Sequence, residues 1–360
     1  MRRATERGRP VAVVVKHAAY ATLALIFAGC SSGARSCSCS GGASGSIGSA
    51  GTRDFTEVET IGTGTPPLVD LRVARWAGLR YRDVVETVGS IALEGQPIVP
   101  GPTMKVTLDH EVLRGSADPI TERRDGAVAR LVEERVVLAD VSVRYDPLPK
   151  PMLDAWNLSL VPLRGSSFIQ RVMEGGNVAF AESELFLGGK PPPELKKALD
   201  GALQDIRRFP FRLPPVPVGV GGKWRFQDDV EANGVKVSEV ADMTVKSVDA
   251  TSAVIDLHVQ QQAAHQEVPN PVKPGEMATL ERFEGDGRGE ITVDRITAVT
   301  VGGQLLTTAR LTLSDVENGQ RRAATLVGAS FLRVTGTVFG DDDGGSAAAN
   351  PAPTPRGVAP

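Results

Sequence analysis

The chain has 360 residues, of which 41% are hydrophobic and 23% are charged, and this composition excludes wholesale disorder. Lys and Arg number 40 against 43 Asp and Glu, so the chain lacks the cationic excess that neutralises nucleic acid phosphates. We therefore expect no nucleic acid partner. With 5% aromatic residues, 39 Gly and 25 Pro, the composition favours many short strands over a helical bundle.

Residues 1–29 have the pattern of a secretory signal peptide. A basic beginning precedes an apolar stretch over 18–28, which is too short to span a bilayer of about 30 Å as a helix. The segment Phe27-Ala28-Gly29-Cys30 then resembles the bacterial lipobox, in which small residues precede a cysteine that is acylated. The resemblance implies cleavage between Gly29 and Cys30, and a lipid anchor (palmitate or a similar acyl chain) on Cys30. An ordinary secretory signal with a cysteine nearby is the alternative.

The position after the anchor predicts where the protein resides. Ser31 stands where an Asp would retain a lipoprotein in the inner membrane, so the resemblance implies the outer membrane of a bacterial envelope. The mature chain has lost the five cations of the leader and is acidic, so we expect the lipid, rather than charge, to hold it at the membrane.

Composition divides the rest of the chain into a tether, a body and a tail. Residues 30–51 are nearly all Ser, Gly and Ala and contain every cysteine of the chain, Cys30, Cys37 and Cys39, so the body has no disulfide. A flexible tether of this length reaches roughly 25 Å. We expect a single body over 52–339 and a disordered tail over 340–360.

Alternation of apolar and polar residues runs through the body, and it predicts a mainly β fold with long antiparallel strands that are apolar on one side only. The residues assigned to the apolar sides are, over 103–113, Met104, Val106, Leu108, His110 and Val112; over 135–145, Val137, Ala139, Val141, Val143 and Tyr145; over 223–232, Trp224, Phe226, Val230 and Ala232; and over 252–262, Ala253, Ile255, Leu257 and Val259.

One segment has helical spacing instead. Residues 193–208 carry Leu195, Leu199 and Ile206 on one side and charged residues on the other, which predicts an amphipathic helix of about 15 residues. Prolines bound it at both ends. We therefore expect two β-meanders, over 52–190 and 210–339, joined by this helix into a half-barrel-like or sandwich body.

Two further segments carry a resemblance to a known family. Residues 213–224 read Leu-Pro-Pro-Val-Pro-Val-Gly-Val-Gly-Gly-Lys-Trp, and residues 287–294 read Gly-Arg-Gly-Glu-Ile-Thr-Val-Asp. Together with the lipobox they resemble an uncharacterised family of bacterial lipoproteins with a Pro-Val-Gly-x-Gly-x-x-Trp segment. The resemblance covers most of 65–335 and implies no catalytic residues. The architecture also resembles, more loosely, the half-barrel of lipoprotein and lipid carriers.

The sequence contains only weak candidates for a phosphate-binding, catalytic or metal site. Residues 218–223 differ from a phosphate-binding loop, because Pro217 takes the place of its first glycine and Trp224 that of its Ser or Thr. His110 lies on an apolar strand side and is interpreted as a buried, hydrogen-bonded histidine. His258 and His265 should point to opposite sides of their strand, which disfavours a zinc site. We expect no catalytic residue, no metal and no cofactor.

Three classes of function then compete. A structural or interaction lipoprotein, with sheets packed on each other, explains the alternation without a ligand. A hydrophobic-ligand or lipid carrier is the alternative, because many apolar strand sides face one predicted helix. An enzyme is the weakest of the three. If a ligand exists, it should contact a face formed by Met104, Val106, Leu108, Trp224, Phe226, Ile255 and Leu257.

Overall fold

The computed structural model describes residues 58–72, 74–124, 127–173, 178–182, 212–232, 235–270, 276–317 and 320–339. The signal segment, the tether with Gly29 and Cys30, the helix predicted over 193–208 and the tail over 340–360 lie outside these residues.

The described chain is mainly strand, as the alternation predicted. Its elements are β1 (Val58–Gly62), β2 (Thr65–Val69), β3 (Arg80–Leu93), β4 (Val99–Arg114), β5 (Ile120–Arg124), β6 (Ala127–Arg144), α2 (Lys150–Leu160), the 3-10 helix η2 (Val161–Leu163), β7 (Ser167–Met173), β8 (Val178–Glu182), β9 (Val218–Val220), β10 (Lys223–Ala232), β11 (Val235–Val248), β12 (Ser252–Ala263), β13 (Gln266–Pro269), β14 (Met277–Asp294), β15 (Thr300–Glu317) and β16 (Gln320–Phe339).

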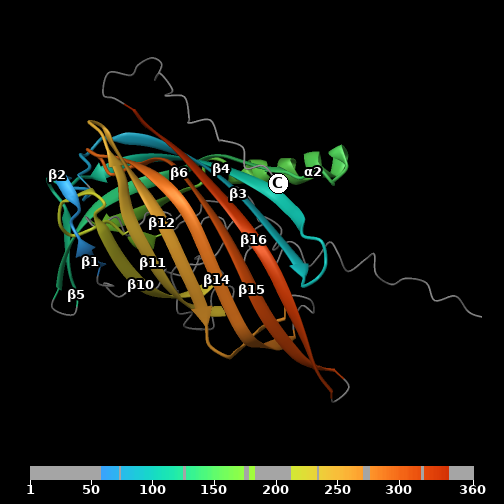
Figure 1. Ribbon diagram of the computed structural model, residues 1–360. Coiled ribbons are helices and arrows are strands. Elements are labelled where there is room, and N and C mark those ends of the chain that lie inside the picture. The colour runs from blue at the N-terminus through green and yellow to red at the C-terminus, as the bar shows by residue number, and fades with distance from the viewer. Residues whose placement is uncertain are drawn as a thin grey trace, which may run out of the picture.

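Fourteen strands form one antiparallel sheet (Figure 1). Its order is β1-β10-β11-β12-β14-β15-β16-β3-β4-β6-β7-β8, with β13 paired to β14 and β5 to β6. In the described part of the chain this path ends at β1 and β8 without closing into a barrel. Strands β2 and β9 form a separate two-stranded sheet.

The two halves of the chain are joined edge to edge. The last strand, β16, pairs with β3 from Leu326 opposite Leu93 to Phe339 opposite Arg80, so the C-terminal strands continue directly into the N-terminal ones. One hydrophobic cluster contains Val85 and Val132 from the N-terminal strands together with Met243 and Ile255 from the C-terminal strands. A single sheet therefore surrounds a shared core.

A row of glycines lies on the buried side of β14. Gly285, Gly287 and Gly289 alternate with charged residues, and their side of the strand continues into the buried Ile291. A Cβ atom at Gly289 would collide with the carbonyl oxygen of Gln304 on β15. The Gly-x-Gly-Glu segment of the sequence therefore permits a close approach between strands at the centre of the sheet.

The Pro-Val-Gly-x-Gly-x-x-Trp segment also has a structural explanation. It forms β9, a turn with Gly221 at a φ of 79°, and the start of β10. A Cβ atom at Gly219 would collide with the carbonyl oxygen of Thr65 on the partner strand β2. Trp224 is completely buried, and its indole Nε1 donates to the carbonyl oxygen of Arg212 at 2.8 Å.

The assignment of faces over 135–145 was wrong in part. Val136 and Leu138 are buried, whereas Val137 and Ala139 are only half-buried. The register between β4 and β6 shifts between Thr107 and Leu108, and this bulge moves the buried side of β6 from even positions to odd ones, so that Val141 is buried again. Alternation alone does not locate a bulge.

The helix α2 was not expected from the sequence. It begins after Pro149, and prolines are compatible with a first helical turn because the backbone N–H groups there have no helical partner. Asn157 fastens it to the free edge of β6: its Oδ1 accepts from the Val143 N–H at 2.7 Å, and its Nδ2 donates to the Val143 carbonyl at 2.9 Å. The amide thus replaces a neighbouring strand.

Candidate functional site

The residues proposed as a ligand face are nearly all inside the protein. Six are buried, and Met104 is half-buried. They belong to two clusters rather than one. Val106 and Leu108 pack with Leu160 of α2 and Leu163 of η2, whereas Trp224, Phe226, Ile255 and Leu257 belong to the central core. Their role toward a ligand stays a prediction.

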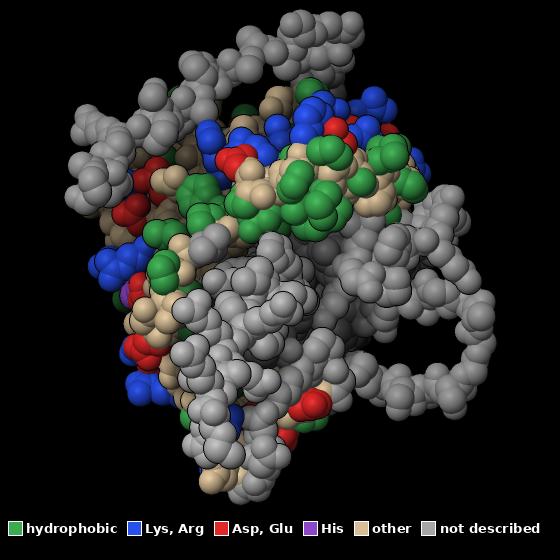
Figure 2. Space-filling view, turned by 90° about the vertical axis from the view of Figure 1, so that its right-hand side faces the viewer, with side chains coloured by type: hydrophobic (Ala, Val, Ile, Leu, Met, Phe, Trp, Pro, Cys, Tyr) green, Lys and Arg blue, Asp and Glu red, His purple; other side chains and the backbone are tan. Residues whose placement is uncertain are grey.

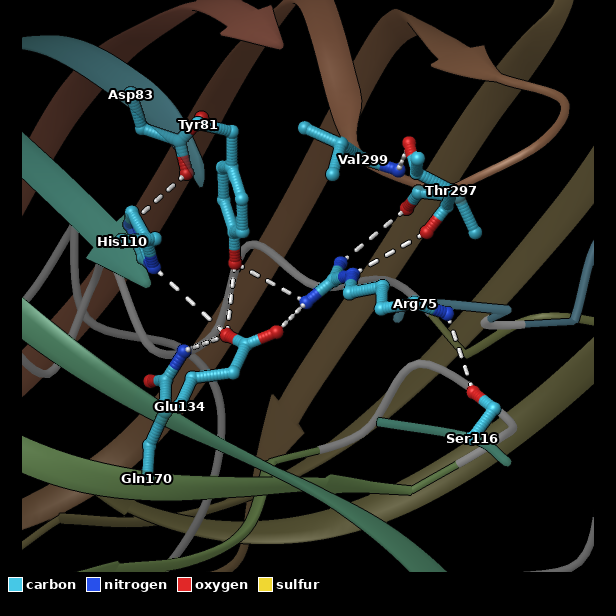
Figure 3. A network of polar contacts seen from close by, with 10 residues as sticks. Arg75, Tyr81, Asp83, His110, Ser116, Glu134, Gln170, Thr297 and Val299 are labelled. Carbon is cyan, nitrogen blue, oxygen red and sulfur yellow. Dashed lines mark hydrogen bonds and ion pairs between the residues drawn. The ribbon is translucent and has the colours of Figure 1, made fainter. Parts of the chain in front are cut away.

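The most concentrated polar chemistry lies around a buried carboxylate, Glu134 of β6 (Figure 3). Its side chain has no exposed surface. Oε1 forms an ion pair with Nη1 of Arg75, while Oε2 accepts from the Tyr81 hydroxyl at 2.8 Å and from Nε2 of Gln170 at 3.0 Å. Strand alternation places Tyr81, Glu134 and Gln170 on the inner sides of β3, β6 and β7.

Arg75 extends this network to the other half of the molecule. The residue lies in the segment between β2 and β3 and is 7% exposed. Its Nε donates to the carbonyl oxygen of Thr297 at 3.2 Å and its Nη2 to that of Ala298 at 3.5 Å, both in the turn between β14 and β15. Ala298 has a φ of 54°, a left-handed conformation that is costly for a residue with a Cβ atom. One guanidinium thus joins two distant parts of the sheet.

His110 adds a second cation. The imidazole is buried on β4 and stacks on the Tyr81 ring with centroids 4.2 Å apart. Its Nε2 lies 3.3 Å from Oδ2 of Asp83, and its Nδ1 lies 3.8 Å from Oε2 of Glu134. The burial of His110 is therefore confirmed, whereas neither ring nitrogen has hydrogen-bond geometry to a described residue; both lie at ion-pair distance from carboxylates.

The electrostatics of the network favour the fully charged state. Burial alone would raise the pKa of Glu134, but Arg75 and His110 outweigh it and hold that pKa well below its usual range. Burial alone would lower the pKa of His110, but Asp83 and Glu134 outweigh it and raise the pKa to about 9. Two cations then balance two carboxylates at neutral pH.

This arrangement suits a structural role. Both oxygens of Glu134 are occupied by donors, and burial raises the pKa of Tyr81 well above its usual value, so that its hydroxyl acts as a neutral donor. A catalytic acid or base needs access to a substrate, which this carboxylate lacks. The network is therefore best described as a cross-link between the two halves of the sheet.

A second polar row crosses the inner sides of β10, β11 and β12. Asp228, Glu239 and Gln261 are neighbours in register and are each at most 9% exposed. The Arg212 guanidinium lies 2.5 Å from both Asp228 oxygens and 5.1 Å from the centre of the Phe226 ring. One signal of this row is visible in the sequence, because Asp228 shares the parity of Trp224 and Phe226.

The two other histidines that the structure describes, His258 and His265, lie apart from each other's partners. Nε2 of His258 lies 2.7 Å from Asp286, and Nδ1 of His265 lies 3.2 Å from Glu281, so each pairs with a different carboxylate of β14. Among the described residues no three His, Cys, Asp or Glu side chains gather in a way that could hold a metal ion. Within the same residues no helix is long and apolar enough to cross a bilayer.

Comparisons with known proteins add no family. No protein-family model and no curated protein matches the chain. Among solved structures, the outer membrane protein OmpT of Vibrio cholerae (in-vitro folded, trimer form) is 8% identical, with 72% of this chain and 100% of that chain covered and a TM-score of 0.14. The toluene transporter TodX of P. putida is 10% identical, with 72% and 90% covered and a TM-score of 0.10. Likenesses at these TM-scores carry no argument about this chain.

The charge on His110 predicts a pH dependence of stability. The folded pKa of about 9 exceeds the ordinary value of 6.5, so protonation favours the folded state. The stabilisation is complete below about pH 6.5 and is lost as the pH rises through about 9, and its size is on the order of 3 kcal/mol. Urea unfolding at several pH values should show this decline in the native chain and not in the His110→Gln variant.

The matched control is His258→Gln, which removes a histidine whose side chain is 34% exposed. This variant should keep the native decline between pH 6.5 and 9. Parallel profiles for the native chain and His110→Gln would contradict a charged His110.

Proposed function

We propose that the protein is a lipid-anchored component of the bacterial envelope, held in the outer membrane through Cys30, whose β body serves as a structural or interaction module. The anchor is supported by the basic and apolar leader followed by Phe27-Ala28-Gly29-Cys30. The Ser and Gly residues that follow Cys30 separate the anchor from β1, which begins at Val58.

The observation that carries the interaction role is the closed interior. Leu108, Trp224 and Ile255, which belong to the face that a hydrophobic ligand would need, are each 0% exposed. Leu108 belongs to the same hydrophobic cluster as Leu160 and Leu163, so α2 and η2 contribute to the packing on this side of the core. A body with a filled core acts through its surface. Carriage of a lipid would require these side chains to separate.

The Cys30→Ser variant tests the anchor. Without the thiol no acyl chain can be attached, so labelled fatty acid should not be incorporated and the protein should leave the membrane fraction. Cys37→Ser is the matched control, because it removes a cysteine only seven positions away and should keep both the label and the fractionation. Acylation that persists in Cys30→Ser would refute the anchor.

Mass spectrometry of an organic extract separates the interaction role from carriage. The protein is purified without detergent as the Cys30→Ser variant, so that any extracted lipid comes from the body rather than from the anchor. A filled core should yield no stoichiometric lipid. About one lipid per chain would instead identify a carrier and refute the structural role.

A further inference from the structure

The helix α2 presents its apolar side to the solvent. Leu158 is 71% exposed, Met152 53% and Trp156 42%, while the only buried residue of the helix is Leu160. Figure 2 shows hydrophobic side chains gathered on this face of the molecule at the height where α2 lies in Figure 1. At 100° per residue, Leu158 lies about 160° from Leu160, whereas Met152 and Trp156 lie one turn apart on the flank nearer to Leu160, so the exposed apolar side chains spread over an arc of about 160°.

Apolar exposure continues past the end of the helix. Val161 of η2 is 43% exposed, and Pro151 and Pro162 are also exposed. Because η2 directly follows α2, and Pro151 lies on the arc between Leu158 and Met152, we treat these exposed side chains as one surface, which we call the α2 face: Pro151, Met152, Trp156, Leu158, Val161 and Pro162. A contiguous apolar patch exposed to solvent marks an interaction site, whereas single exposed apolar residues are common on any protein surface.

The α2 face is electrically neutral and has few hydrogen-bonding groups. The charged residues of α2 are Lys150 and Asp154, and they pair with each other at 2.7 Å. The Ser159 hydroxyl donates to the carbonyl oxygen of Trp156 at 2.6 Å, within the helix itself. The indole N–H of Trp156 is then the principal polar group that the face offers.

This chemistry distinguishes a lipid surface from a protein partner. Protein interfaces contain about one hydrogen bond per 100–200 Å² and a polar rim, and they use charge to fix orientation. Contact with hydrocarbon requires neither hydrogen bonds nor charged groups. An indole with one N–H is suited to the boundary between acyl chains and headgroups. A neutral face also requires no anionic lipid.

We propose that the α2 face docks on the surface of the lipid bilayer, where Met152, Trp156 and Leu158 enter the interfacial layer. This inference rests on the proposed function, in which an acyl anchor keeps the body close to the membrane. The anchor raises the local concentration of the α2 face at the bilayer, so a weak contact suffices to orient the body.

The test uses the chain from residue 30 onward as Cys30→Ser, so that binding cannot arise from an acyl group. It is mixed with phosphatidylcholine vesicles whose acyl chains carry bromine, which quenches a tryptophan that enters them. We expect partition into the vesicles, quenching that is lost in Trp156→Phe, and little change with salt. Met152→Ser combined with Leu158→Ser should weaken the partition roughly tenfold or more.

The matched control is Met277→Ser combined with Leu306→Ser, which removes the same two side-chain types at 56% and 52% exposure on β14 and β15. It should bind as the parent does. The proposal is overturned if the parent does not partition, if both double variants bind equally, or if the Met152 and Leu158 changes instead dissociate a dimer in sedimentation experiments.

The two proposals fail separately. A native chain that is not acylated at Cys30, combined with vesicle binding through the α2 face, refutes the anchor alone. If the native chain is acylated but its Cys30→Ser form does not bind vesicles, the docking proposal alone is refuted.

Discussion

A carboxylate with no exposed surface is stable as an anion only when cations and donors replace the water that it has lost. Glu134 meets this condition through Arg75, Tyr81, Gln170 and His110. Because these partners come from separate strands and from the segment before β3, their relative positions are fixed by one side chain. Removing one partner would leave an uncompensated charge in the core, which costs more than the pair itself contributes.

The network explains why an open sheet can hold a closed core. No strand pairing joins β1 to β8, the two edges of the described sheet. The N-terminal strands meet the C-terminal ones where β3 pairs with β16, β1 with β10 and β2 with β9. Arg75 supplies a side-chain connection, from Glu134 on β6 to the carbonyl oxygens of the turn between β14 and β15. The Arg212 and Asp228 pair gives the strands on the other side of the core a similar buried contact. With the core closed, contacts with other molecules are made by the surface, and the α2 face carries exposed apolar side chains there.

Much of the fold could be predicted from the sequence, because a side chain's face follows directly from parity along a strand. That rule placed Leu108, Trp224 and Ile255 inside and His110 beside them. It failed on β6, where a bulge shifts the parity between Leu138 and Val141. It also gave no sign of α2, whose prolines suggest a loop and most of whose apolar residues are exposed.

The candidate site could be predicted only in part. Sequence reasoning recognised His110 as buried, but its partners are brought to it by the pairing of strands, and Arg75 lies 222 positions from the carbonyl of Thr297. No local pattern encodes such a contact. The available signal is a charged residue with the parity of a buried side, as at Asp228, and it marks where a buried partner is required. Glu134 carried no such signal, because the predicted parity of its strand placed it on the polar side.

The central claim is that Arg75 and Glu134 act as one unit that fastens the two halves of the sheet. A double-mutant cycle with Arg75→Met and Glu134→Gln, measured by urea unfolding, tests it directly. Each single change should cost about 3–5 kcal/mol, and the double variant should cost less than their sum by roughly 1–3 kcal/mol. The exposed pair of Arg72 and Asp70 provides the control cycle, with an expected coupling of about 0–1 kcal/mol. Additive costs for Arg75 and Glu134, or a coupling no larger than that of the exposed pair, would contradict the account.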